Sequence, residues 1–344
     1  MEPLHENEPR EFLVGDFKVL TSFDGGTFGE IYLGESLYTG ECVAVKLEKA
    51  NAQYPQLAYE YRVYRALKAT LGLPRIYYFN AEDDHAALVM EMLGPSLAYL
   101  FEYCHRCFTL RTVLMLADEL LLRLEYVHGR GFVHRDIKPD NFLIGREVSC
   151  KRLHIIDFGL AKKYADPITQ VHIPYREGRH LTGTARFASI GAHEGYEQSR
   201  RDDLISIGYM LLYFVKGSLP WQNLEANTKQ QKYRRIHEMK LKLSNEQLCR
   251  GLPSVFAMYL NYCYELPFAA KPDYKRLRRM FSQLRCKLYP KDGRSRMFDW
   301  EIITLQYHHN QRNPGKGRRG LPIKRPADEV YNGDVVNRAP RNCR

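Results

Sequence analysis

The feature that most constrains the fold of this chain is a change of hydrophobic pattern near residue 93. Before it, short β-rich runs such as 30–33 and 42–47 are separated by glycines, which predicts a sheet of antiparallel hairpins. After it, apolar residues recur at spacings of three and four over 111–127, which predicts a long buried helix that ends at Gly129. The sequence therefore predicts an α+β architecture, with a small β-rich lobe followed by a larger helical lobe.

Weaker patterns fill in both lobes. In the first lobe, residues 57–67 follow a helical pattern, and 75–79 and 87–92 resemble strands. In the second lobe, further helices are expected near 202–215, 229–243, 254–264 and 273–287. We divide the chain into an N-terminal extension (1–14), a two-lobed domain (15–306, with lobes at about 15–92 and 94–306) and a basic tail (307–344).

Composition excludes several other classes of protein. With 344 residues, 44% of them hydrophobic, the chain can bury a full core, so wholesale disorder and fibrous structure are excluded. No uninterrupted apolar run approaches the roughly 18 residues that span a bilayer, and residues 1–10 are polar, so neither membrane insertion nor secretion is expected. The eight scattered cysteines lack the density of a disulfide scaffold and fit reduced thiols in a cytoplasmic and nuclear protein.

Two local features have a simple interpretation and a functional one. Cys104 and Cys107 have the spacing of half a zinc site, but no second Cys or His pair follows, which favours a helix surface or a connection between helices. Residues 312–344 contain nine Lys or Arg against three acidic residues, with many Pro and Gly, so we expect disorder from about 309. The tail fits a nuclear localisation signal, a contact with an anionic surface or simple solubilisation; nucleic acid is not expected as a partner.

The strongest chemical signal is the run His-Arg-Asp-Ile-Lys-Pro-Asp-Asn at 134–141, which lies between two short strand-like pieces and is followed by Asp-Phe-Gly at 157–159. Phosphoryl transfer needs an acceptor hydroxyl held in line and counter-charge around the phosphates. Asp136 can accept the hydroxyl proton and Lys138 can neutralise the transferred group. Asn141 and Asp157 offer the hard oxygen ligands that Mg²⁺ prefers. The alternative, a buried turn stabilised by aspartates, fits either motif alone better than both in this order.

These runs resemble the catalytic and metal-binding loops of eukaryotic protein kinases. By the same resemblance, Val-Ala-Val-Lys at 43–46 contains the lysine that grips the ATP phosphates, and Glu60 is its ion-pair partner. Asp203 resembles the helix-start aspartate that braces the catalytic loop, although Ile205 stands where tryptophan is usual. The expected fold is therefore the bilobal kinase fold, with ATP and Mg²⁺ as cofactors.

The finer resemblance is to the casein kinase 1 family of serine/threonine kinases, closest to the alpha type because the tail is short. Lys138, two residues after the catalytic aspartate, and Thr184 in Gly-Thr-Ala-Arg are typical of serine/threonine kinases. The Ala-Pro-Glu that usually ends the activation segment is replaced by Ser-Ile-Gly-Ala-His at 189–193. Distinguishing strings occur at 93–97, 138–143, 157–164, 172–176, 181–186, 197–203, 218–222 and 298–300.

The resemblance also implies the binding residues. The expected ATP-binding set is Asp24, Gly25, Gly26, Thr27, Phe28, Gly29, Ile31, Ala44, Lys46, Glu60, Met90, Glu91, Leu93, Leu143 and Ile156. Within it, backbone groups of Glu91 and Leu93 read adenine and Met90 is the gatekeeper. Arg179, Arg186 and Lys232 are expected to form an anion pocket, which implies acidic or phosphorylated protein substrates. The resemblance further implies a monomer that acts in signal transduction.

Three departures from the family pattern motivate an alternative. Asp24 replaces the first glycine of the phosphate-covering loop, Gly191 replaces an asparagine, and Asn223 replaces a glycine. Asp tolerates tight turns, and the two glycines nearest the phosphates are retained, so we expect weakened rather than abolished ATP binding. The alternative is a pseudokinase, a folded scaffold with impaired nucleotide binding. A metabolite or lipid kinase is disfavoured by the long segment at 160–193, which is expected to face a polypeptide substrate.

Overall fold

The computed structural model describes residues 12–26, 29–49, 51–52, 55–81, 85–146, 152–166, 168–169, 171–291 and 297–312. The chain divides into two compact units. Of the described residues, the first unit holds those up to Ala69, Pro74–Leu93 and those from His308 onward, and the second holds Thr70–Leu73 and Gly94–Tyr307. The change of hydrophobic pattern near residue 93 thus coincides with a boundary between the units.

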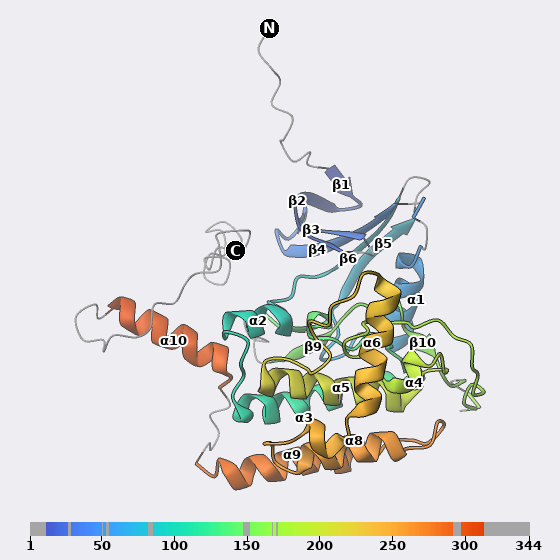
Figure 1. The fold of residues 1–344 in the computed structure, drawn as a ribbon. Helices are drawn as coiled ribbons and strands as arrows, with labels where there is room; N and C mark the ends of the chain where they lie inside the picture. The colour runs from blue at the N-terminus through green and yellow to red at the C-terminus, as the bar shows by residue number, and fades with distance from the viewer. Residues whose placement is uncertain are drawn as a thin grey trace. The chain divides into compact units, whose positions relative to one another are not determined.

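The first unit is built on a six-stranded antiparallel sheet in the order β1-β2-β3-β4-β6-β5 (Figure 1). The strands are β1 (Phe12–Val14), β2 (Phe17–Gly26), β3 (Gly29–Ser36), β4 (Cys42–Lys49), β5 (Ile76–Ala81) and β6 (His85–Glu91). The predicted hairpins are confirmed. The N-terminal extension predicted for 1–14 overlaps β1, because Phe12–Val14 pairs with the start of β2.

Helix α1 (Leu57–Leu67), which packs against β5 and β6 of this unit, has the bounds that its periodicity predicts. Its apolar stripe buries Leu57, Val63 and Leu67. The N-cap Gln56 makes no side-chain cap bond. Instead the buried Glu48 of β4 accepts hydrogen bonds from the backbone N–H of Gln56 (2.7 Å) and Leu57 (3.0 Å), which satisfies two donors at the helix start.

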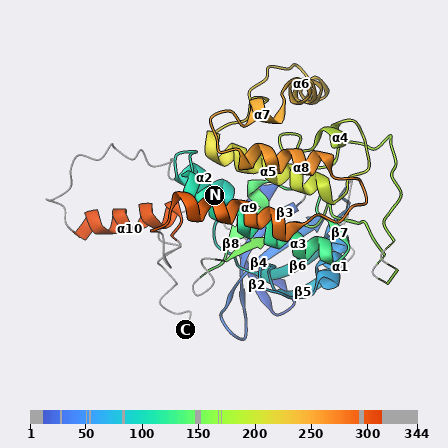
Figure 2. The same cartoon turned by 90° about the horizontal axis from the view of Figure 1, so that it is seen from below.

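The second unit is mostly helical. Its α-helices are α2 (Leu97–Tyr103), α3 (Leu110–Gly129), α4 (Ile190–His193), α5 (Arg200–Lys216), α6 (Lys229–Lys242), α7 (Asn245–Leu248), α8 (Val255–Glu265), α9 (Tyr274–Leu288) and α10 (Asp299–Arg312), the last of which belongs to this unit as far as Tyr307. In its core, α3 packs against α5 and α9, and α5 packs against α8 (Figure 2). The long helix and the four later helices predicted from periodicity are confirmed within a few residues, whereas α2, α4, α7 and α10 were not predicted.

Short strands hold the loops of the second unit. β7 (Phe132–Val133) pairs with β10 (Lys162–Lys163), and β8 (Phe142–Ile144) pairs with β9 (Leu153–Ile155). The run at 134–141 therefore lies between two strand pieces, as predicted, and ends in a 3-10 turn, η1 (Pro139–Asn141). Two antiparallel ribbons thus fix both ends of the loop that carries Asp136.

The C-terminal boundary differs from the prediction. α10 continues to Arg312, past the tail boundary set at 307, and its first turn is anchored by the buried Phe298, Asp299 and Trp300. Residues 313–344 of the predicted tail lie outside the described residues. Cys104 and Cys107 lie in the connection between α2 and α3, which is the simpler of the two interpretations of that pair. No helix in the described part of the chain has both the length and the apolar composition needed to cross a membrane.

Candidate active site

In the first unit, the predicted lysine and glutamate form a buried ion pair. Lys46 Nζ lies 2.7 Å from Glu60 Oε2, and the two side chains are 12% and 2% exposed. The lysine comes from β4 and the glutamate from α1, whose N-terminus is held to that same strand by Glu48. Both charges are therefore placed by elements that contact each other directly.

The strand register gathers further nucleotide-binding candidates on one face of the sheet. Ile31 is paired with Lys46, and Ala44 is paired with Met90. Directly opposed residues share a face, as do residues two apart on one strand. These four residues therefore share one face of the sheet, opposite the one on which Val43 and Val45 join the buried valine cluster. The structure thus brings together candidates that the resemblance supplied one by one.

The remaining candidates of the first unit flank this face. Glu91 is the last residue of β6. Its backbone N–H donates to the Arg75 carbonyl (2.8 Å), so of its two backbone polar groups the carbonyl is the one that this bond does not use. Leu93 is buried. In the glycine-rich hairpin, the backbone of Asp24–Gly26 closes β2 and Gly26 is paired with Gly29. Thr27 and Phe28 lie outside the described residues.

In the second unit, Asp203 at the start of α5 braces the catalytic loop, as the resemblance implied. One carboxylate oxygen accepts from the backbone N–H of His134 (2.7 Å) and from His128 Nε2 (2.8 Å), and the other accepts from the Arg135 N–H (2.8 Å). Burial alone would raise the pKa of Asp203, but the hydrogen bond from His128 and the backbone bond from His134 lower it overall. Asp203 is therefore held as a carboxylate beneath the loop.

His128 completes this brace as a neutral imidazole. Burial lowers the pKa of His128 despite its carboxylate neighbour. Its Nε2–H donates to Asp203, so Nδ1 is left to accept from the Tyr274 hydroxyl at 2.6 Å. The helices α3, α5 and α9 are thus connected through one buried chain of hydrogen bonds that ends on the catalytic loop.

Two residues of the site have left-handed backbone conformations that are rare outside glycine. Arg135 has a φ of 69° and Asp157 a φ of 66°. Such a residue costs on the order of 1–3 kcal/mol and persists only where its surroundings fix it. The surroundings of Arg135 are visible: its N–H bonds Asp203, and its Nε donates to the Leu160 carbonyl at 2.7 Å. The sequence motifs do not reveal this strain.

The Asp136 carboxylate is oriented by the segment after Gly183. Asp136 Oδ1 accepts from both the backbone N–H and the hydroxyl of Thr184, each at 2.8 Å. Asp136 Oδ2 lies 2.9 Å from Lys138 Nζ. Gly183, with a φ of 92°, lies so close that an added Cβ would stand 2.2 Å from the Arg135 carbonyl oxygen. The three predicted catalytic residues are therefore in direct contact, and only glycine fits before Thr184.

Lys138 is held as a cation. Burial would lower the pKa of Lys138, but the charge of Asp136, the hydrogen bond to it and the charge of Asp157 raise the pKa above its ordinary value.

Nearby, Leu143 on β8 is paired with His154. The Ile156 N–H donates to the Asn141 carbonyl (3.0 Å), and the Ile156 carbonyl accepts from His134 Nε2 (3.0 Å). The last two nucleotide-binding candidates thus belong to the same bonded network.

The chemistry of the donor set fits magnesium. Asn141 Nδ2 donates to the Asp136 carbonyl at 2.8 Å, which fixes the amide and leaves its oxygen as the potential ligand. Asp157 adds a carboxylate. Among the described residues, no group of three or more His, Cys, Asp or Glu is arranged to hold a metal ion. Two oxygen ligands from the protein, with the rest supplied by phosphate and water, is the arrangement that Mg²⁺ favours.

The predicted anion pocket is dispersed over separate elements. Arg179 Nε pairs with the buried Glu197 at 3.1 Å. Arg186 is exposed, and its guanidinium lies over the rings of Phe187 (5.7 Å) and Tyr213 (5.6 Å). Lys232 is exposed in the second turn of α6. A shared site for these three cations remains a prediction.

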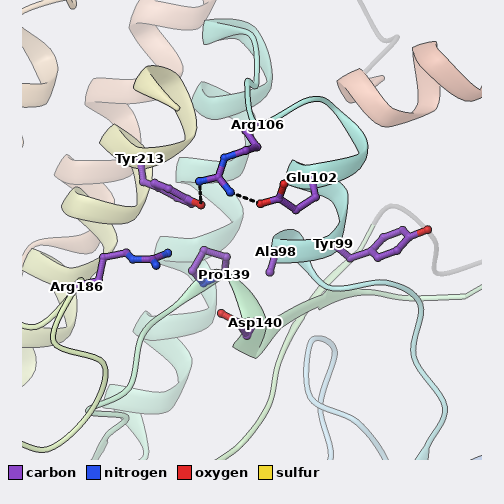
Figure 3. Close-up of a pocket in the computed structure, with 8 residues that line it drawn as sticks. All are labelled: Ala98, Tyr99, Glu102, Arg106, Pro139, Asp140, Arg186 and Tyr213. Atoms are coloured by element: carbon purple, nitrogen blue, oxygen red, sulfur yellow. Dashed lines mark hydrogen bonds and ion pairs between the residues drawn. The ribbon is translucent and has the colours of Figure 1, made fainter. Parts of the chain in front are cut away.

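One of these cations borders a half-open pocket of about 410 Å³. Figure 3 shows the Arg186 side chain extending toward Pro139 of the catalytic loop, with Asp140 on the same side. On the opposite wall, Arg106 donates to Glu102 and to the Tyr213 hydroxyl (3.1 Å). The other lining residues are Ala98 and Tyr99. The pocket therefore places a guanidinium beside the loop that carries Asp136.

Two functional candidates were missed from the sequence. Glu197, 3% exposed, binds Lys162 (2.6 Å) and Arg179, and so ties β10 to the segment before α4. Lys240, also 3% exposed, donates to the carbonyls of Ala185 and Ala188. Neither carries a local signal, since their partners lie up to 55 residues away. Lysine and glutamate are almost never buried without a partner, so their burial, once it is known, is the signal that draws attention to these two residues.

The fold and the site together define an enzyme of phosphoryl transfer. The family model of the protein kinase domain matches residues 17–297, which is most of the chain. This chain therefore belongs to the protein kinase family, with its β-rich N-terminal region and helical C-terminal region. Kinases of this family in general use ATP and Mg²⁺.

Proposed function

We propose that this chain is an active serine/threonine protein kinase of the casein kinase 1 type, which moves the γ-phosphoryl group of Mg·ATP to hydroxyls of acidic or phosphorylated proteins. The observation that carries the proposal is the Asp136 carboxylate. One of its oxygens is fixed by two hydrogen bonds from Thr184, and the other faces the Lys138 ammonium. Positioning a base and a counter-charge is most of what phosphoryl transfer asks of a protein.

The nucleotide is assigned to residues of both units. Lys46, fixed by Glu60, would hold the α and β phosphates, and the sheet face with Ala44 and Met90 would contact the adenine ring. Asn141 and Asp157 would hold the magnesium ion. When bound, the ion supplies positive charge that neutralises the phosphates.

The protein's own part in the reaction follows from the loop. The acceptor hydroxyl donates a hydrogen bond to Asp136, which holds the oxygen toward the γ-phosphorus. Asp136 accepts the proton as the new oxygen–phosphorus bond forms and the bond from the γ-phosphorus to the ADP oxygen breaks, so that ADP leaves. Lys138 is cationic because its pKa is raised, and it stands next to the base, where negative charge is transferred. Asp203 keeps the backbone of the loop in the strained conformation that presents both side chains.

The substrate class is inferred from three residues. Lys138 and Thr184 occupy the positions typical of serine/threonine kinases and contact Asp136 directly. Arg186 presents an exposed guanidinium at the pocket beside the loop, and a guanidinium binds phosphate or carboxylate through a planar pair of donors. A substrate with an acidic or phosphorylated residue near the acceptor would satisfy this cation.

The test is phosphate incorporation from labelled ATP into three matched peptides: phosphorylated, acidic and neutral. Wild type is expected to modify serine or threonine, with the phosphorylated peptide preferred. Replacing Arg186 and Lys232 together with Ala should lower kcat/KM about 10-fold or more on the phosphorylated peptide, and much less on the neutral one, because each lost charged contact is worth about 1.5–3 kcal/mol. Equal losses on both peptides would contradict the anion pocket.

The pseudokinase alternative rests on the sequence departures, and two of them have a structural explanation. Asn223 has a φ of 59°, a conformation that glycine adopts freely and asparagine better than most residues. A Cβ at Gly191 would meet its nearest atom, on Tyr196, only at 3.5 Å, an ordinary contact, so this position does not require glycine. The alternative predicts neither labelled peptide nor a rise in melting temperature with Mg·ATP.

A further inference from the structure

Lys240, on α6, is a buried lysine with no carboxylate partner among the residues that the structure describes. Its Nζ donates to the carbonyls of Ala185 (2.9 Å) and Ala188 (2.5 Å) and lies 3.2 Å from His193 Nε2. The rings of Tyr209 and Trp221 each lie 5.0 Å from the same nitrogen. A buried lysine is costly unless its donors are satisfied, so a position that retains one implies a specific use for the hydrogen bonds.

The number of acceptors matches the number of donors. An ammonium has three N–H groups: the two carbonyl oxygens accept two of them, and His193 Nε2 accepts the third in the tautomer that leaves this nitrogen unprotonated. In the other tautomer the same nitrogen donates to the Ala185 carbonyl, 3.2 Å away. The two aromatic faces add cation–π attraction. Burial lowers the pKa of Lys240 well below its ordinary value. Hydrogen bonds to carbonyl oxygens and contacts with aromatic faces favour the charged form of a lysine.

The carbonyls belong to the turn that orients the catalytic base. Thr184, which makes both hydrogen bonds to Asp136 Oδ1, immediately precedes Ala185. Its own carbonyl accepts from the N–H groups of Phe187 (2.9 Å) and Ala188 (3.0 Å). The Arg186 carbonyl accepts from Trp221 Nε1 at 2.8 Å. All carbonyls from 184 to 186, and that of 188, are thus bound, two of them by one lysine.

We propose that Lys240 is a positioning residue for catalysis, which fixes the turn 184–188 so that Thr184 holds Asp136 and Arg186 faces the substrate. It acts through backbone carbonyls only, and therefore does not depend on the side chains of that turn. This places a specificity and activity determinant on α6, about a hundred residues after the catalytic loop. The inference rests on the proposed kinase activity for its first readout and is independent of it for its second.

The first readout is steady-state kinetics on the phosphorylated peptide. Lys240→Met keeps an unbranched side chain that is one atom shorter and removes all three donors. We expect kcat to fall about 100-fold, the effect of a small misplacement of a catalytic group, while the KM for ATP changes less than about twofold. Lys240→Arg, which restores donors, should recover part of the loss. Lys242→Met, on an exposed lysine of the same helix, is the matched control and should resemble wild type.

The second readout needs no enzyme activity. Trypsin cleaves after Arg186, whose carbonyl is bound inside the turn, so this cleavage reports opening of the turn. In Lys240→Met, cleavage after Arg186, followed by mass spectrometry, should accelerate about 10-fold or more, with cleavage elsewhere unchanged. Lys242→Met should leave the Arg186 rate unaltered. If wild type lacks kinase activity, this readout still decides the role of Lys240.

The results of the two readouts together decide whether the proposal holds. Wild-type kcat and wild-type cleavage in a folded Lys240→Met protein would overturn the proposal, whereas an active wild type with both changes in the variant would support it. If Lys240→Met does not fold, Lys240→Gln, which keeps an amide donor, replaces it in both readouts. Failure of both variants to fold would show that Lys240 serves global stability, and would also overturn the proposal.

Discussion

Two buried side chains of opposite charge bind backbone groups of the catalytic loop and of the neighbouring turn. Asp203 supplies acceptors to backbone N–H groups of the loop, and Lys240 supplies donors to backbone carbonyls of the turn 184–188. In both cases the side chain satisfies backbone groups that the irregular conformation leaves without helix or sheet partners. The strained φ of Arg135 and the close approach of Gly183 indicate why such external partners are needed.

His193 predicts a pH dependence of stability. Burial, together with the charge of Lys240 and to a lesser extent His237 on α6, lowers the pKa of His193 to about 3, although the Ala185 carbonyl opposes this. Because an unfolded histidine takes up a proton near its ordinary pKa, the unfolded state binds more protons between these values. The free energy of unfolding should therefore fall as pH drops below about 6.5, by up to ~1.4 kcal/mol per unit.

The measurement is denaturant unfolding of wild type and His193→Gln between pH 7.5 and 4.5. The variant should show a flatter dependence over this window, and His180→Gln, at an exposed histidine, should follow wild type. Parallel curves for wild type and His193→Gln would contradict the assigned environment of His193.

At the scale of elements, strands and helices bring charged residues to positions that hydrophobic periodicity alone does not predict. β4 contributes Lys46 to the ion pair and Glu48 to the start of α1, so one strand both presents the lysine and holds the helix that carries its partner. In the second unit, the first turn of α5 contains Asp202 and Asp203, and α6 contributes Lys240. Each of these residues bonds to groups outside its own helix or strand.

Glu48→Gln tests the link between β4 and α1. The amide loses the charge that favours the helix N-terminus, so the free energy of unfolding should fall by about 1–2 kcal/mol, as for loss of a cap. Because α1 carries Glu60, the KM for ATP should also rise. Glu238→Gln, at an exposed i,i+4 pair with Arg234, should change stability by less than about 0.5 kcal/mol. If Glu48→Gln lowered the free energy of unfolding as little as Glu238→Gln does, the proposed link between β4 and α1 would be contradicted.

The bounds of α1 and the existence of the long helices followed from the sequence because their apolar faces repeat clearly. α2 was missed because Leu97–Tyr103 is short and apolar on most sides, and α10 because its burial depends on an anchor in Phe298–Trp300 rather than on a continuous stripe. The residues proposed as catalytic could be singled out in the sequence because they occur in local motifs. Lys240 and Glu197 were not, because their partners are distant in the sequence and their burial is a property of the fold.

At the scale of the whole molecule, the residues assigned to one reaction are divided between the two units. The first holds Lys46 and Glu60, and the second holds Asp136, Asn141 and Asp157. Neither unit alone therefore contains the full set for binding Mg·ATP and transferring its phosphoryl group. The same reasoning makes Asp136 the most informative residue to change, since its loss should remove transfer while leaving the assigned nucleotide contacts intact.

The most direct test is phosphoryl transfer by Asp136→Asn, with Mg·ATP binding followed by the shift in melting temperature. The exchange keeps the shape of the side chain and removes the base, so transfer to the phosphorylated peptide should fall about 100-fold or more while the shift persists. Asp118→Asn, at a half-buried ion pair with Arg278, controls for the change of carboxylate to amide and should stay active. An Asp136→Asn protein that transfers phosphate at the wild-type rate would contradict the account.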